Sequence, residues 1–110
     1  MAEHKRADFD IADASSATQL VAGVAGKQLT LYEFRCEAAN ESDKAFTVNV
    51  QDDEATPIEI VPAQNLSTGA SAIDIIARNG FIGQTTAAAD LDIIASAANR
   101  IFGYVVYSEE

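Results

Sequence analysis

The segment from Ile101 to Tyr107 constrains the fold of this chain most, because it carries apolar side chains on both faces of one extended strand. Alternate positions form two sets of three residues on opposite sides of the strand: Ile101, Val105 and Tyr107, and Phe102, Tyr104 and Val106. A small antiparallel sheet normally buries only one face. The pattern therefore predicts that one set packs in the core and that the other lines a contact with a second subunit.

Most of the remaining chain alternates apolar and polar residues with the period of a half-buried strand. The clearest case is residues 46–51, where Phe46, Val48 and Val50 alternate with polar side chains. The longest is residues 28–38, in which one face is apolar throughout and the other changes from leucine to charged residues. The predicted strands cover residues 6–13, 18–22, 28–38, 46–51, 73–75, 90–96 and 101–107, with a further strand that begins at Ile58 and is interrupted by Pro62.

About seven or eight short strands separated by brief turns are typical of a sandwich or a jelly roll. At 110 residues and 11.6 kDa the chain has the size of one domain with its own core. We therefore expect an all-β, single-domain antiparallel β-sandwich or jelly roll over residues 9–110. Residues 1–8 are expected to form a flexible N-terminal arm.

One segment leaves an alternative open, and another predicts a turn. Residues 86–98 could form a helix capped by Thr86, although a strand over residues 90–96 fits the rest of the chain better. The apolar face of that helix would consist of Leu91, Ile94, Ala95 and Ala98. The Asn79-Gly80 pair lies between apolar runs, which favours a hairpin turn.

The formal net charge of −10 excludes several classes of partner. Binding to nucleic acid needs clustered Lys and Arg to replace counterions, and an anionic membrane surface would repel this chain. The first thirteen residues lack the apolar run of a secretory signal, and no segment holds the roughly 18 apolar residues of a membrane span. We therefore expect no nucleic-acid or membrane partner, and synthesis in the cytoplasm without a signal peptide.

Residues capable of catalysis are sparse. His4 is the only histidine and Cys36 the only cysteine, so a nucleophile with a positioned base has little support, and a four-ligand zinc site has none. Cys36 alternates with Phe34 on an apolar face, which predicts a buried, inert thiol. The acidic run Asp52–Glu54 could offer oxygen ligands to Ca²⁺, but a solvated turn is the preferred interpretation. We predict that the chain is not an enzyme and has no catalytic, cofactor or metal site.

Residues 17–31 and residues 87–107 resemble the opening and the close of small β-sandwich proteins encoded by tailed bacteriophages. That group includes capsid decoration, or cement, proteins, which are jelly-roll homotrimers on the outside of the head that clamp neighbouring capsomers. The resemblance implies a structural virion protein on the capsid exterior, with itself and the major capsid protein as partners. We expect the arm to contact the capsid through Ala2, Glu3, His4, Lys5 and Arg6.

Related modules also occur on tail fibres and tail tips. The alternative function is therefore a receptor- or carbohydrate-binding module of a phage tail. The absence of tryptophan and the acidity of the chain weaken a carbohydrate-binding interpretation.

Overall fold

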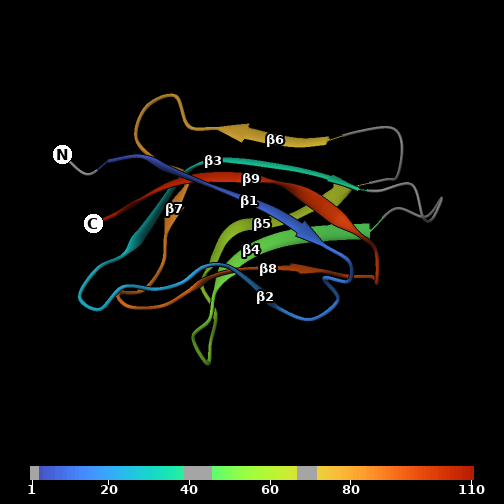
Figure 1. The fold of residues 1–110 in the computed structure, drawn as a ribbon, viewed down its shortest axis with the longest axis horizontal. Helices are drawn as coiled ribbons and strands as arrows, with labels where there is room; N and C mark the ends of the chain where they lie inside the picture. Colours follow the sequence, from blue (N-terminus) through green and yellow to red (C-terminus); the bar gives the residue numbers. More distant parts are fainter. Residues whose placement is uncertain (1–2, 39–45, 67–71) are drawn as a thin grey trace.

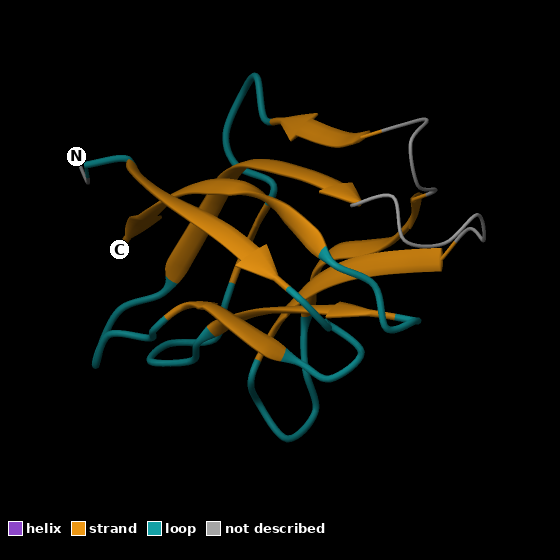
Figure 2. Cartoon of the chain, turned by 45° about the vertical axis from the view of Figure 1, so that its right-hand side comes forward, coloured by secondary structure: helices purple, strands orange, loops and turns teal. Residues whose placement is uncertain are grey.

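The computed structural model describes residues 3–38, 46–66 and 72–110, which form strands and loops without a helix (Figure 2). Within these residues, no helix is long and apolar enough to cross a membrane. The strands are β1 (Lys5–Ile11), β2 (Thr18–Val21), β3 (Leu29–Ala38), β4 (Phe46–Asp52), β5 (Glu59–Leu66), β6 (Ala72–Ile76), β7 (Gly83–Gln84), β8 (Leu91–Ala95) and β9 (Ile101–Glu109).

The strands form two antiparallel sheets that pack face to face (Figure 1). The first sheet has the order β1-β9-β3-β6, with β7 also paired to β3, and the second has the order β2-β8-β4-β5. Consecutive strands lie in different sheets everywhere along the chain except from β4 to β5 and from β6 to β7. This arrangement is that of a jelly roll, and the predicted all-β sandwich is confirmed.

The core lies between the two sheets and consists largely of branched residues. From β9, Ile101 and Val105 have no exposed surface, and Val48, Val50 and Ile93 of the second sheet are equally buried. Burying one such side chain contributes about 1.5–3 kcal/mol. Of the two faces predicted for this strand, the one with Ile101 and Val105 therefore packs in the core of its own chain, so these two residues are not available for a subunit contact.

A β-bulge at Tyr32 explains why residues 28–38 change character along their length. Leu31 pairs with Tyr107 and Glu33 with Val106, so Tyr32 is an extra residue in the ladder between β3 and β9. The inward face consequently shifts from Leu31 to Phe34, and both side chains are buried. Tyr32 instead shares a hydrogen bond of 3.0 Å with the hydroxyl of Ser108.

Strand pairing settles the open alternative and tests the predicted hairpin. Residues 91–95 form strand β8 between β2 and β4, so the strand interpretation is confirmed over the helix. A turn follows β6, with Gly80 in the left-handed region at a φ of 91°. The predicted hairpin is wrong, however, because β6 and β7 both pair with β3, at successive positions along it.

The N-terminal arm is shorter than predicted. Residues 5–8 belong to β1, which pairs with β9 along its whole length. Ala7 lies opposite Val105 and packs against the core, and the Lys5 ammonium lies 2.8 Å from Glu109. Strand β1 therefore begins at Lys5, and the prediction that residues 5–8 belong to a flexible arm is wrong. Ala2 lies outside the described residues.

Candidate protein-binding surface

The outer face of the first sheet presents a regular array of side chains. The register of β1, β9, β3 and β6 aligns four residues in each of three successive rows, with every residue at least partly exposed. The rows are Asp10–Phe102–Glu37–Ala72, Asp8–Tyr104–Arg35–Asp74 and Arg6–Val106–Glu33–Ile76. We call this array the outer surface. Its apolar column follows β9, and charged columns flank it on β1 and β3.

Two guanidinium groups cover the aromatic rings of the outer surface. The Cζ atom of Arg6 lies 4.0 Å from the centre of the Tyr104 ring, and that of Arg100 lies 5.6 Å from the centre of the Phe102 ring. Both distances fall within the range of cation–π attraction. The rings are therefore half-buried beneath charged groups of the same chain.

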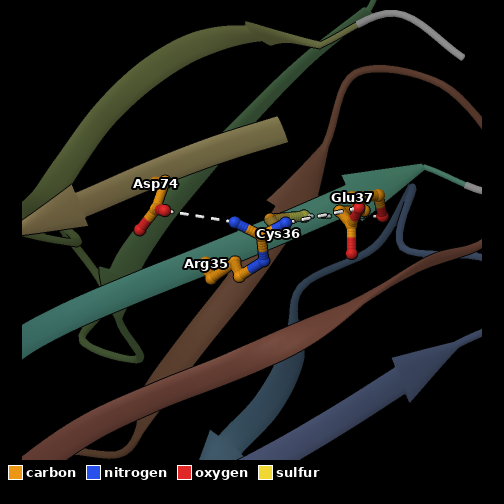
Figure 3. Close-up of polar contacts among 4 residues, drawn as sticks. All are labelled: Arg35, Cys36, Glu37 and Asp74. Atoms are coloured by element: carbon orange, nitrogen blue, oxygen red, sulfur yellow. Dashed lines mark hydrogen bonds and ion pairs between the residues drawn. The ribbon is translucent and has the colours of Figure 1, made fainter. Parts of the chain in front are cut away.

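The charged residues of the outer surface are paired across strands. Arg35 reaches Asp74 at 3.1 Å and Glu37 at 3.5 Å, spanning β3 and β6 (Figure 3). Arg100 binds both carboxylate oxygens of Asp10, at 2.8 and 2.7 Å. Exposed pairs contribute at most about 1 kcal/mol each, so their main effect is to fix the side-chain geometry.

The Tyr104 hydroxyl completes this network. It donates a hydrogen bond of 3.0 Å to Glu33, and this bond, together with burial and the nearby negative charge, raises the pKa of Tyr104. The tyrosine is therefore held neutral and oriented by its neighbour on β3.

A depression of about 440 Å³ opens on the same face. Its lining contains three arginines, two carboxylates and three aromatic rings: Arg6, Phe9, Asp10, Arg35, Glu37, Arg100, Phe102, Gly103 and Tyr104. Neither a cysteine nor a histidine is among them, and each arginine has a carboxylate partner. The depression therefore combines aromatic rings with arginine–carboxylate pairs.

The structure brings together two groups of residues that the sequence analysis treated separately. Arg6, predicted as part of the capsid-binding arm, stacks on Tyr104, predicted as part of a subunit interface. Glu3 and His4 precede β1, and the His4 ring stacks on Tyr32 with 4.0 Å between ring centres. Tyr107 is half-buried against the core.

Sequence reasoning missed Arg35, Arg100 and Asp10 as members of the outer surface. The signal for Arg35 was its place in the alternating charged run of β3. Arg100 and Asp10 are ninety positions apart, so their pairing had no local signal.

Asp52 is a structural carboxylate and not a free cation ligand. Its side chain has no exposed surface and accepts hydrogen bonds from the amides of Glu54, Ile58 and Thr86 and from the Thr86 hydroxyl. Burial alone would raise the pKa of Asp52, but these hydrogen bonds outweigh it and hold the pKa below its usual value. Within the described ranges, no three His, Cys, Asp or Glu side chains converge as a metal site would require.

The buried thiol predicted at Cys36 is confirmed. Cys36 has no exposed surface, and burial, with a smaller contribution from Glu37, raises the pKa of its thiol to about 12. A thiol with that pKa is almost entirely protonated at neutral pH and is a poor nucleophile.

Comparison with known proteins finds a distant likeness to a solved structure. No protein-family model matches the chain, and no curated protein matches it. A solved structure described under the words "Bacillus endospore appendages form a novel family of disulfide-linked pili" superposes on it with a TM-score of 0.58 and 15% sequence identity. The match covers 96% of this chain and 86% of that one. At this identity the likeness shows a shared fold.

Proposed function

We propose that this chain is a non-enzymatic structural protein that decorates the outside of a tailed-phage head as a homotrimer. The resemblance of residues 17–31 and 87–107 to phage β-sandwich proteins motivates this assignment. In this proposal the outer surface contacts the major capsid protein. Three weak contacts in one rigid trimer then act together, which gives a long-lived attachment.

The observation that carries the proposal is the composition of the outer surface. Phe102, Tyr104 and Val106 are half-buried at its centre, and arginines and carboxylates surround them. Aromatic residues and arginine are enriched in binding sites between proteins, where a polar rim encloses the central anchors.

The same composition favours contact with the capsid over contact between subunits. Permanent subunit interfaces are more apolar and resemble a divided core. The outer surface instead has charged residues on both sides of one apolar strand. We therefore assign Phe102, Tyr104 and Val106 to the head contact, and not to the subunit contact expected from their sequence pattern.

The structural neighbour agrees with an assembly role, since it is described in connection with pili. Its disulfide linkage does not carry over, because the single cysteine of this chain is fully buried. The alternative of a carbohydrate-binding module has less support. A sugar-stacking platform exposes ring faces, whereas Arg6 and Arg100 cover the rings of Tyr104 and Phe102.

The proposal is tested with virions and heads of the phage that encodes the chain. Mass spectrometry of purified virions should detect the protein, and purified protein should sediment with expanded heads that lack it. The double variant Phe102→Ser with Tyr104→Ser should weaken this binding at least about tenfold, because an aromatic anchor contributes more than about 1 kcal/mol.

The matched control is Gln19→Ser, which changes an exposed residue on β2 of the other sheet and should leave head binding intact. Virions without the protein, or full binding by the double variant, would overturn the assignment. Binding to a glycan array without binding to heads would support the tail module instead.

A further inference from the structure

Strand β6 is an edge of the first sheet that lacks the usual protection against pairing. Among the described residues, only β3 pairs with it. Its single charge, Asp74, already binds Arg35, and Ile76 is 57% exposed. Edge strands are normally blocked by charges, by proline, by a bulge or by being short. The edges of the second sheet follow this rule, because β5 contains Pro62 and β2 has four residues and a bulge.

The hydrogen-bond alternation shows which groups of β6 point away from the sheet. The Ala77 amide donates to the Tyr32 carbonyl of β3, so the odd-numbered residues of this segment bond inward. The N–H and C=O groups of Ala72, Asp74 and Ile76 therefore point toward the open edge.

The opposite edge of the same sheet, β1, is complementary to β6. The Glu110 amide donates to the Gln28 carbonyl, so the even-numbered residues of β9 bond to β3 and the odd-numbered ones bond to β1. On β1, this leaves the backbone groups of Arg6, Asp8 and Asp10 pointing outward.

Strand direction and charge together select one pairing. The strands of the first sheet alternate in direction from β1 to β6, so a second copy in the same orientation places its β1 antiparallel to β6. A residue of that β1 can pair with Asp74 only if its own N–H and C=O groups also point outward, which holds for Arg6, Asp8 and Asp10. Two of them, Asp8 and Asp10, would repel Asp74, whereas Arg6 would attract it.

We propose that subunits join edge to edge through β6 of one copy and β1 of the next, with Asp74 opposite Arg6 of the second copy. In this register Ala72 lies opposite Asp8, and Ile73 lies opposite Ala7 on the core side of the extended sheet. The first sheet then continues from one subunit into the next.

The contact is heterologous, because different edges meet, and it closes into a ring when the rotation between subunits permits. It supplies the subunit contact of the proposed trimer. The inference rests on the self-association in the proposed function and is independent of head binding.

Cysteine cross-linking tests the register directly. Residues in a hydrogen-bonded antiparallel pair have Cα atoms about 5.5 Å apart, which suits a disulfide. A mixture of the Arg6→Cys and Asp74→Cys proteins should oxidise to heterodimers, while buried Cys36 stays unreactive. Replacing the first partner by Asp10→Cys, four residues along β1, should abolish the cross-link. Homodimers of Asp74→Cys alone, or no heterodimers, would overturn the register.

A backbone variant tests the edge itself. Ala72→Pro removes an outward N–H opposite Asp8 of the next copy and leaves the ladder between β6 and β3 intact, whereas Ala72→Ser keeps that N–H. Light scattering should give a trimer mass for the native chain and Ala72→Ser, and a monomer mass for Ala72→Pro. A trimer that survives Ala72→Pro would overturn the edge contact alone. A native chain that stays monomeric at all concentrations would overturn the contact together with the proposed trimer.

Discussion

The carboxylate of Asp52 binds both the amide and the hydroxyl of Thr86, at 3.1 and 2.9 Å. Its other oxygen accepts from the amides of Ile58 and Glu54, at 3.0 and 3.3 Å. One buried side chain thus ties the loop between β4 and β5 to the segment that leads into β8. This relationship explains why an aspartate ends β4, in an acidic run that sequence alone could assign to calcium.

Replacing Asp52 should destabilise the protein strongly. Asp52→Ala leaves buried donors without an acceptor, and hydrogen bonds to a charged group contribute about 1.5–3 kcal/mol each. We expect a loss of about 3 kcal/mol in the free energy of unfolding, measured by urea titration. The control is Glu54→Ala, because the Glu54 side chain is exposed and its amide remains. Equal stability of the two variants would contradict this account.

Asp52 and Asp92 should respond to pH in opposite directions. The lowered pKa of Asp52 means that its stabilisation is complete above the ordinary aspartate pKa and is lost as pH falls through its folded pKa. The pKa of Asp92 is raised by burial and then by the charges of Asp53, Asp90 and Asp52, so its ionised form opposes folding. This penalty is complete above the folded pKa of Asp92. It declines as pH falls below that value, and it is absent once pH lies below the pKa of the unfolded chain.

The variant Asp92→Asn should therefore stabilise the protein by about 0.5–1 kcal/mol near neutral pH, the size of a like-charge term between strands. The gain should vanish near pH 3, roughly a unit below the ordinary aspartate pKa, where the native aspartate is protonated in both states. Thermal unfolding across this pH range measures the difference. A gain that persists unchanged in acid would show that charge is not its cause.

The alternation of apolar and polar residues correctly predicted the strands in which every second side chain faces the core. Phe46, Val48 and Val50 are buried and β4 spans Phe46–Asp52, close to the predicted range. The same rule failed to foresee the bulge at Tyr32, because one extra residue reverses the faces without any local change of composition. It also missed β7, whose two residues are too few to show a period.

The outer surface was only partly predictable for a related reason. Its apolar column belongs to one strand and was visible as a pattern in residues 101–107. Its charged columns depend on which strands become neighbours, and β1 meets β9 across almost the whole chain. Pairs such as Arg100 with Asp10 therefore follow from topology and not from spacing in the sequence.

Cys36 should react very slowly in the folded protein. Its thiol is fully buried and its pKa is raised to about 12, so both access and ionisation are suppressed at neutral pH. Labelling with a chromogenic disulfide reagent should be complete in guanidinium chloride and negligible without it. Rapid labelling of the folded chain would show that the strand pairs around Cys36 open readily.

Gly103 should tolerate no side chain. It lies in β9 opposite Phe9 of β1 and Cys36 of β3, and a Cβ atom there would lie 1.9 Å from the Arg35 carbonyl oxygen and 2.7 Å from its carbon. Backbone atoms cannot move aside as a flexible side chain can, so the strands would have to separate. Gly103→Ala should cost about 3 kcal/mol or more, the upper end of overpacking effects.

The control for this variant is Gly26→Ala, where no atom lies within 4 Å but φ is +76°. It should cost only about 1 kcal/mol, from backbone conformation. Urea unfolding of both variants separates close approach from conformational preference, and equal losses would contradict the steric argument. Because Gly103 also lines the depression on the outer surface, separation of β9 from β3 at this point would displace Arg35 and Tyr104 together. Any Gly103→Ala protein that folds should therefore bind heads less well than Gly26→Ala.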